Sequence, residues 1–332
     1  MKSALIVGMG SIGRRHARVL KSCGVEHVGG ADLRQDRLDQ AKAEIGLTDL
    51  GTDYAAMLKA HKYDTVLITT PTAYHTPIAL AAVKAGCHIL IEKPVADVQD
   101  GLDAVSAVVK EKGLIAYTAY CYRFAPSAER LKALVDEGRI GRILSARLKI
   151  SSYLPDWHPW EDYRTFYMAK LEQGGGARLD ESHGVDLLRW LFGDVASVYA
   201  LVDKVSDLEI DADDLTIMTL RFKNGVVGEA HFDLLGRAPR IDVELIGADG
   251  TILWDRITSK IDIYDAATKE WTTEDFGPGN FVTCYDRQTE HFIDCVRSGK
   301  APRTDLADGR KTLDVLVAAL KSSQTGQVVK LA

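Results

Sequence analysis

The stretch ALIVGMGSIG, residues 4–13, decides the fold of this 332-residue chain. It opens with a short apolar run that is typical of a strand buried on both faces of a parallel sheet. The spacing G-x-G-x-x-G follows, and the next residues carry apolar side chains at roughly helical intervals. Strand, glycine turn and helix in this order predict a dinucleotide-binding unit, in which the residues expected at the pyrophosphate are Gly8, Gly10, Ser11, Ile12 and Gly13.

The three glycines of this turn are expected to serve different purposes. Gly8 permits the tight turn, Gly10 lets the pyrophosphate approach the backbone, and Gly13 lets helix and strand pack closely. Amide groups at the start of the helix then face the anion. Glycine-rich turns also arise for packing alone, so the interpretation depends on the residues that follow.

The next strand candidate, residues 27–32, ends in Asp32. An acid about twenty residues after the glycine turn accepts hydrogen bonds from the ribose hydroxyls of NAD. A turn or cap before the helix expected at residues 35–45 would use the same residue type. Arg34 keeps a second cofactor open, because a guanidinium at this place can bind the 2′-phosphate of NADP. The expected cofactor is therefore NAD, with NADP as the alternative.

Composition and charge narrow the class of protein. Hydrophobic residues make up 46% and charged residues 27%, as in soluble globular proteins, and the length suggests two domains. A net charge of -6 offers no basic surface to nucleic acid or to an anionic membrane, and no apolar run approaches the span of a bilayer. The first residues run into a strand rather than a secretory signal, and the five scattered cysteines suit reduced thiols. We expect a cytoplasmic protein without nucleic-acid or membrane partners.

The strand and helix patterns change near residue 120. Before it, strands alternate with helices, which predicts a doubly wound parallel sheet of the Rossmann type for an NAD(P)-binding domain at residues 1–120. After it, strand candidates are joined by strong turn pairs such as Asn224-Gly225 and Asp249-Gly250. Residues 121–332 are expected to form an α+β domain with a large, open, mostly antiparallel sheet, so that the fold class is α/β. Helices should cover one face of this sheet, and the other face is available to a second subunit.

Two strands of the first domain end in polar residues at the edge where nucleotides bind in such sheets. The first end reads TTPTAYH, which also suits a helix entry with Thr76 as N-cap and Pro77 after it. The second reads HILIEKPVA, whose charge pair also suits the solvated end of a buried strand. The residues of these two ends that we expect at the cofactor are Thr70, Pro71, His75, Glu92 and Lys93.

Three motifs can be combined: GMGSIG at residues 8–13, TTPTAYHTPIALAAVKAGCHILIEKP at 69–94 and YRFAP at 122–126. Together they resemble the glucose-fructose oxidoreductase, inositol dehydrogenase and rhizopine catabolism family, written Gfo/Idh/MocA, over essentially the whole chain. The resemblance implies that the lysine of EKP, Lys93 here, contacts both the nicotinamide ribose and the substrate. It also implies a homodimer or homotetramer formed through the open sheet. Within YRFAP, Tyr122 and Arg123 are candidate substrate contacts.

The segment GGGARLDESHGVDLLRWLFG, residues 174–193, is the strongest candidate for catalysis in the second half. Its glycines would allow close approach of a ligand, and Asp180, His183 and Asp186 are three residues apart, a spacing that shares one helix face. Carboxylates beside an imidazole fix its tautomer and raise its basicity, whereas a histidine near a helix start often only satisfies local hydrogen bonds. The family resemblance implies that His183 is catalytic. It places the accompanying aspartate four residues earlier, where this chain has Leu179, so Asp180 departs from the pattern.

The segment between these motifs, SSYLPDWHPWEDYRTFYMAK at residues 151–170, is dense in aromatic residues. Aromatic rings stack on the apolar faces of sugars, and their polar tips bind hydroxyl groups. The same composition is common at domain interfaces and oligomer contacts. Candidate substrate contacts in this segment are His158, Arg164 and Tyr167, of which the first two would also suit a carboxylate or a phosphate.

The expected activity is hydride transfer between NAD(P) and a secondary alcohol of a sugar, an inositol or a sugar derivative. His183 would remove the hydroxyl proton, Lys93 would orient the hydroxyl and stabilise negative charge on its oxygen, and Asp180 would orient His183 or hold a neighbouring hydroxyl. No metal is expected, because no cluster of histidines and cysteines has ligand spacing. The alternatives are a redox-neutral glycosidase or sugar-sugar oxidoreductase that recycles a tightly bound NAD, a biliverdin-like or dihydrodiol substrate, and a non-enzymatic regulator that senses the cofactor.

Overall fold

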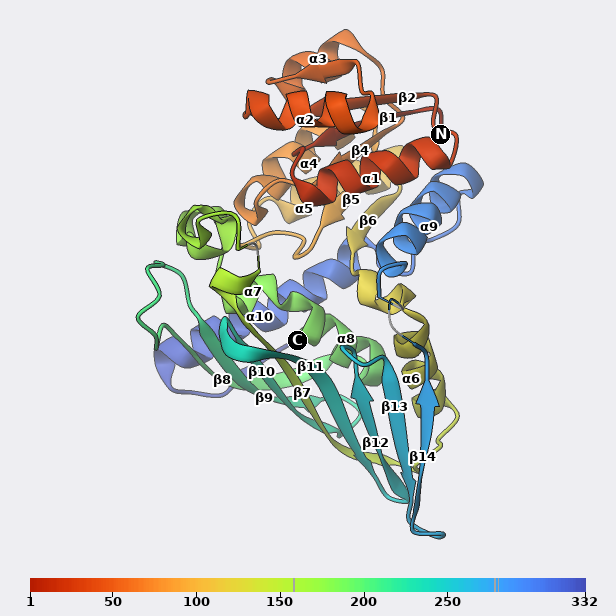
Figure 1. Cartoon of the computed structure of the whole chain (residues 1–332), viewed down its shortest axis with the longest axis vertical. Helices are drawn as coiled ribbons and strands as arrows, with labels where there is room; N and C mark the ends of the chain where they lie inside the picture. Colours follow the sequence, from red (N-terminus) through yellow and green to blue (C-terminus); the bar gives the residue numbers. More distant parts are fainter. Residues whose placement is uncertain (158, 278, 280) are drawn as a thin grey trace. The chain divides into compact units, whose positions relative to one another are not determined.

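The computed structural model describes residues 1–157, 159–277, 279 and 281–332. The chain divides into two compact units, which are drawn together in Figure 1. The first unit comprises Met1–Tyr120 and Tyr285–Arg310, and the second comprises Cys121–Cys284 and Lys311–Ala332. The sequence did not indicate that the chain returns to the first unit at Tyr285–Arg310.

The first unit is built on a parallel sheet, as the alternating pattern predicted. Six strands of its described residues pair in parallel in the order β3-β2-β1-β4-β5-β6. Their bounds are β1 Ser3–Val7, β2 His27–Ala31, β3 Asp49–Gly51, β4 Thr65–Ile68, β5 His88–Glu92 and β6 Ala116–Ala119. The order reverses between β1 and β4, and ligands bind beside the carboxyl ends of strands at such a point. The doubly wound fold is therefore confirmed, and only the three-residue β3 lacked a sequence signal.

Helices flank both faces of this sheet (Figure 1). Their bounds are α1 Ser11–Ser22, α2 Gln35–Ile45, α3 Tyr54–Ala60, α4 His75–Lys84, α5 Leu102–Lys112 and α9 Cys284–Ser298. Helix α9 belongs here because its ring residues pack on β6: the ring centroids of His291 and Phe292 lie 6.0 and 5.8 Å from that of Tyr117. Just beyond α9, the Thr304 hydroxyl donates to the Thr118 carbonyl at 2.6 Å. An amphipathic pattern does not reveal which sheet a helix covers, so the sequence could not place α9.

The second unit is built on one large sheet. Nine strands of its described residues lie in the order β14-β13-β12-β11-β7-β10-β9-β8-β15, with β7 and β10 parallel and the other neighbours antiparallel. The bounds are β7 Ile143–Tyr153, β8 Val195–Asp203, β9 Leu215–Phe222, β10 Val227–Asp233, β11 Leu235–Gly247, β12 Gly250–Asp255, β13 Lys260–Asp265, β14 Glu270–Asp275 and β15 Val329–Lys330. The mostly antiparallel sheet is confirmed. Strand β14 was not predicted, because its side chains are mostly exposed and leave no alternating apolar pattern.

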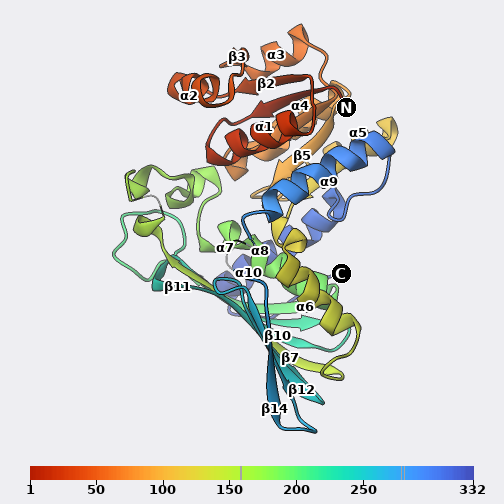
Figure 2. The same ribbon diagram turned by 45° about the vertical axis from the view of Figure 1, so that its right-hand side comes forward.

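Helices of the second unit run along one face of this sheet (Figure 2). They are α6 Pro126–Asp136, α7 Ala177–Asp180, α8 Ser182–Phe192 and α10 Leu306–Thr325. On β8, Val198 and Ala200 are buried, whereas the intervening Tyr199 and the next residue, Leu201, are about half exposed. Alternation along β11 and β12 likewise turns Ile246 and Leu253 outward. The face opposite the helices therefore carries exposed apolar side chains.

Candidate functional site

The glycine turn lies between β1 and α1, as predicted, and its three glycines have different surroundings. Gly8 has φ +102°, and a Cβ there would lie 2.6 Å from the Thr69 carbonyl group; a Cβ on Gly13 would overlap the Gly8 carbonyl oxygen. These two positions need glycine for internal packing. At Gly10 the nearest atom to an added Cβ is a guanidinium nitrogen of Arg37 at 3.9 Å, so the backbone is open to a ligand.

The start of α1 is suited to an anion. Gly10 is the N-cap and makes no side-chain cap hydrogen bond, so the first amide groups of a twelve-residue helix remain available. Ser11 is exposed and Ile12 half-buried beside them. A helix N-terminus with uncapped amides attracts phosphate. The open space at Gly10 and these amides fit the pyrophosphate of a dinucleotide.

Asp32 lies directly after β2, with its carboxylate held by the backbone. Its Oδ2 accepts from the Met9 amide at 2.7 Å, and its Oδ1 accepts from the Arg34 amide at 2.9 Å. A carboxylate has about four acceptor sites, so this group can still bind a ribose hydroxyl. The local geometry suits the role expected from the sequence.

The cation beside this carboxylate is Arg37, which was not among the candidates predicted from the sequence. Arg37 points its guanidinium at Asp32, with Nη1 3.4 Å from Oδ2. The side chain of Arg34 instead forms a two-pronged ion pair with the exposed Asp36, whose pKa it lowers. Arg37 is also the residue nearest to Gly10, so it is better placed than Arg34 for a 2′-phosphate.

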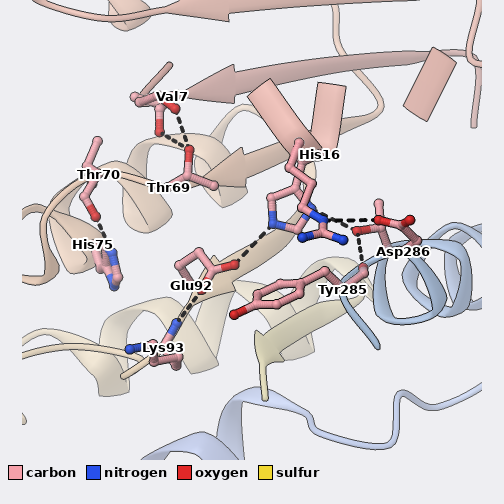
Figure 3. Close-up of polar contacts among 12 residues, drawn as sticks. Val7, His16, Thr69, Thr70, His75, Glu92, Lys93, Tyr285 and Asp286 are labelled. Atoms are coloured by element: carbon pink, nitrogen blue, oxygen red, sulfur yellow. Dashed lines mark hydrogen bonds and ion pairs between the residues drawn. The ribbon is translucent and has the colours of Figure 1, made fainter. Parts of the chain in front are cut away.

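The first polar strand end, after β4, is organised by His75. This buried ring contacts two carbonyl oxygens, that of Thr70 through Nε2 at 2.9 Å and that of Pro94 through Nδ1 at 3.0 Å. Burial lowers the pKa of His75, while these two carbonyls favour the protonated ring. Figure 3 shows the contact with Thr70, which lies beside Pro71. His75 therefore joins the segments that follow two neighbouring strands.

Two further expectations for this strand end concern the Thr70 hydroxyl and the start of helix α4. The Thr70 hydroxyl is buried and has no hydrogen-bond partner among the described residues. A buried hydroxyl of this kind is suited to a polar ligand. Helix α4 begins at His75 with Tyr74 as its N-cap, so the expected N-cap role of Thr76 is wrong and Pro77 is the third residue of the helix.

The second polar strand end, after β5, is not a solvated end. The side chain of Glu92 is 13% exposed, and its Oε1 lies 3.1 Å from Nε2 of the buried His16 (Figure 3). Its Oε2 accepts from the Lys93 amide at 3.2 Å. His16 continues to α9 through Thr289, whose Oγ1 is 2.8 Å from Nδ1. The sequence missed His16, although a histidine beside the apolar positions Ala17 and Leu20 of a helix was a signal.

In the second unit, two candidate residues lie in direct contact. The rings of Tyr122 and His183 are stacked, with their centroids 4.1 Å apart and an angle of 2° between the planes. His183 is 5% exposed, and burial raises the pKa of Tyr122 above its usual range. Arg256, another residue without a sequence signal, lies over the Tyr122 ring at 4.9 Å. The imidazole is therefore held flat against an aromatic neighbour.

The helix expected to carry Asp180, His183 and Asp186 is interrupted. Helix α7 ends at Asp180, and α8 begins at Ser182 after Glu181, which has φ -88° and ψ 24°. The prediction that a three-residue spacing places Asp180 and His183 on one helix face is therefore wrong. Asp180 accepts a hydrogen bond from the hydroxyl of Tyr167, so these two candidates are brought together.

Asp186 and Arg123 form a buried ion pair. The Arg123 Nη2 lies 2.6 Å from Asp186 Oδ1 and its Nε lies 3.0 Å from Oδ2, with side chains 7% and 0% exposed. Such a fork-to-fork pair satisfies both groups geometrically. From the sequence we expected Arg123 at the substrate and Asp186 beside His183. No sequence pattern indicated that Arg123 and Asp186 form a pair.

The remaining candidates are Arg164, His158 and the glycines before α7. Arg164 is half exposed and bonds Asp162 at 2.8 Å and Glu209 at 3.0 Å. His158 lies outside the described residues. The glycines before α7 approach the chain itself, because a Cβ on Gly175 would overlap the Tyr167 carbonyl and one on Gly176 would overlap Asp213. These two glycines are therefore explained by packing rather than by the approach of a ligand.

Two further findings concern the described residues as a whole. None of their helices combines the length and the apolar character needed to cross a membrane. They contain no group of three or more histidine, cysteine, aspartate or glutamate side chains that could hold a metal ion.

Comparison with known proteins identifies relatives along the whole chain. The myo-inositol 2-dehydrogenase of Thermotoga maritima is 28% identical over 337 residues, which is 98% of this chain and 97% of that protein. The WlbA dehydrogenase of Bordetella pertussis, solved with NADH and UDP-GlcNAcA, is 25% identical with a TM-score of 0.84 over 99% of this chain and 98% of the other. Levoglucosan dehydrogenase, solved with NADH and levoglucosan, has the same fold, with 23% identity and a TM-score of 0.87 over 99% and 98%.

Family models match both parts of the sequence. Residues 2–120 match the model described as "Oxidoreductase family, NAD-binding Rossmann fold". Residues 132–331 match the model described as "Oxidoreductase family, C-terminal alpha/beta domain". The resemblance noted from the motifs and the expected NAD cofactor are confirmed. The chain therefore belongs to the Gfo/Idh/MocA oxidoreductase family.

Proposed function

We propose that this protein is a dehydrogenase that transfers a hydride between NAD(P) and a secondary alcohol of an uncharged sugar or polyol. The observation that carries the proposal is the buried His183, stacked on Tyr122, in a chain that also has the NAD-binding domain of an oxidoreductase family. A buried imidazole with a fixed ring plane suits proton removal from a hydroxyl. The relatives named as inositol and levoglucosan dehydrogenases act on the same class of compound.

The proposed chemistry divides between a few side chains. When bound, the nicotinamide supplies the acceptor for the hydride. His183 takes the hydroxyl proton, and the ammonium group of Lys93 orients the hydroxyl and stabilises negative charge on its oxygen. Asp180, held by the Tyr167 hydroxyl, is proposed to bind a neighbouring hydroxyl of the substrate.

The charges in the second unit support an uncharged substrate. Arg123 is neutralised by Asp186, and Arg164 is paired with Asp162 and Glu209. Binding an acidic substrate through Arg123 would take the two-pronged ion pair away from a fully buried carboxylate, which is costly. We therefore favour a neutral ring over a uronate or a sugar phosphate.

A cofactor and substrate panel tests this function. Purified protein is titrated with NADH and NADPH by fluorescence, and then assayed with inositols, neutral sugars, their uronates and sugar nucleotides. The expected result is tight binding of one cofactor and reduction of NAD(P)+ by a neutral polyol, with the matching uronate at least tenfold poorer in kcat/KM. Binding of neither cofactor would overturn the proposal. Cofactor that stays bound through gel filtration, without net NADH formation, would indicate the redox-neutral alternative.

The choice between NAD and NADP is predicted to depend on Asp32 and Arg37. Asp32→Ala should weaken NADH binding about tenfold or more and NADPH binding less, because hydrogen bonds to a charged group contribute about 1.5–3 kcal/mol. Arg37→Gln should weaken NADPH more than NADH, since it removes the cation beside Asp32. Arg34→Gln is the matched control, because its side chain is paired with Asp36. A selective loss of NADPH binding in Arg34→Gln instead would show that Arg34 is the phosphate ligand. Dissociation constants from fluorescence titration measure all three.

Assembly and location complete the proposal. We propose a homodimer or homotetramer through the sheet face that carries Tyr199, Leu201, Ile246 and Leu253, because exposed apolar side chains on one sheet face favour association. A cytoplasmic location is supported by the five cysteines, which all have free thiols.

A further inference from the structure

We propose that His16 and His75 are positioning residues for Lys93, each of them anchoring one of the two residues that flank this lysine in the chain. Neither histidine is expected to touch the substrate. The inference rests on the proposed function only in that Lys93 is taken to act on the substrate hydroxyl. The geometry itself lies within the first unit, and Figure 3 shows its His16, Glu92 and Lys93 side.

The anchor on the carboxyl side is His75. Its Nδ1 lies 3.0 Å from the carbonyl oxygen of Pro94, the residue directly after Lys93, and its Nε2 lies 2.9 Å from the Thr70 carbonyl. The ring is 1% exposed, so water does not compete for these contacts. A neutral imidazole donates to one of the two carbonyls, and an imidazolium donates to both. The imidazolium therefore ties the chain after Lys93 to the segment after β4, whereas the neutral ring holds the Pro94 carbonyl when its hydrogen is on Nδ1.

The anchor on the amino side is His16, acting on Glu92. The Thr289 hydroxyl donates to the Tyr285 carbonyl at 3.0 Å and lies 2.8 Å from Nδ1 of His16, while the other ring nitrogen lies 3.1 Å from Glu92 Oε1. With a hydrogen on Nε2 the ring donates to Glu92 Oε1, which ties this carboxyl group to helix α9. The second oxygen of Glu92 accepts from the Lys93 amide, so His16 fixes the backbone at Lys93 itself.

This arrangement explains why His16 and His75 are buried at this place. Direct contact with a ligand does not explain it. Both ring nitrogens of each are already engaged by groups of the protein. A flexible lysine side chain is useful at a reacting centre only if its backbone is held, because errors of about 1 Å in position cost large factors in rate. Two anchors on opposite sides of one residue supply that restraint.

A double-mutant cycle tests whether the histidines act through Lys93. His16→Leu and His75→Leu should each lower kcat about tenfold or more, with KM and NADH affinity changed less than threefold. In the Lys93→Met background the same substitutions should lower kcat by less than twofold, because the residue that they position is gone. His75→Asn, which keeps a donor near Nδ1, should recover part of the rate. Equal losses of kcat in both backgrounds would overturn the proposal, since a merely structural role is additive.

A second measurement does not depend on the substrate. It uses milder substitutions, in case the leucine variants fold poorly. Lysines are reductively methylated with 13C, and the Lys93 signal is assigned by its loss in Lys93→Met. His16→Gln and His75→Asn should shift this signal, whereas His88→Gln should leave it in place. His88 is the matched control because it lies at the other end of β5 and accepts a hydrogen bond from the Ile115 amide at 2.8 Å. An unchanged Lys93 signal in folded His16 and His75 variants would refute positioning even if no substrate is found, and a failure of the proposed function alone would leave the shifts intact.

Discussion

Lys93→Met and His183→Ala are each expected to lower kcat by about a hundredfold or more, while the affinity for NADH stays within about threefold of the wild type. The size follows from the part that a positioned acid, base or cation plays in proton removal, which is typically worth a factor of about 10²–10⁴. Methionine preserves the length and apolar stem of the lysine, and so removes the charge with little change in packing. Steady-state kinetics with the identified polyol and fluorescence titration with NADH provide the two numbers.

Loss of activity must be separated from loss of structure for His183. The ring is 5% exposed and stacked on Tyr122, so alanine also removes a packed contact. Tyr122→Phe is the matched control, since it keeps the stacked pair and should retain kcat within about threefold. A large fall in the thermal midpoint of His183→Ala alongside its loss of kcat would count against His183 as the general base. So would a kcat that added imidazole does not restore. A loss of kcat at an unchanged thermal midpoint would support His183 as the general base.

The first unit was largely predictable from sequence because its signals are local. A buried strand followed by G-x-G-x-x-G requires the turn found at Gly8, and the acid at Asp32 lies in the same short stretch. Apolar runs separated by amphipathic segments then predict a doubly wound parallel sheet. The sequence could not identify His16 as part of this region, because its partners Glu92 and Thr289 are 76 and 273 residues away in the chain. Arg37 was also missed, although it is only five residues from Asp32.

The second unit shows why candidate sites are harder to predict than folds. The spacing of Asp180 and His183 suggests one helix face, but a single residue with non-helical dihedrals at Glu181 separates them into two helices. The glycines before this segment resemble a ligand cradle, although their space is taken by the chain itself. Stacking of Tyr122 on His183 joins segments about sixty residues apart, and no periodic pattern encodes such a contact.

Asp186→Ala is expected to destabilise the protein more than any other single substitution considered above, by about 3–5 kcal/mol in the free energy of unfolding. It would leave the Arg123 guanidinium, 7% exposed, without the carboxylate that now binds it through two hydrogen bonds. A buried cation that loses its two-pronged carboxylate keeps the cost of its desolvation with much less compensation. Urea unfolding monitored by circular dichroism and by tryptophan fluorescence measures the change.

The double variant Arg123→Met, Asp186→Leu separates the cost of an orphaned charge from the value of the pair. Removing both charges should be less destabilising than removing Asp186 alone, since an apolar pair of similar size avoids the buried charge. Arg164→Met is the matched control, because the pairs of this arginine with Asp162 and Glu209 are exposed and should contribute little to stability. If Arg123→Met instead raised KM at unchanged stability, Arg123 would be a substrate ligand, and the argument for an uncharged substrate would lose its main support.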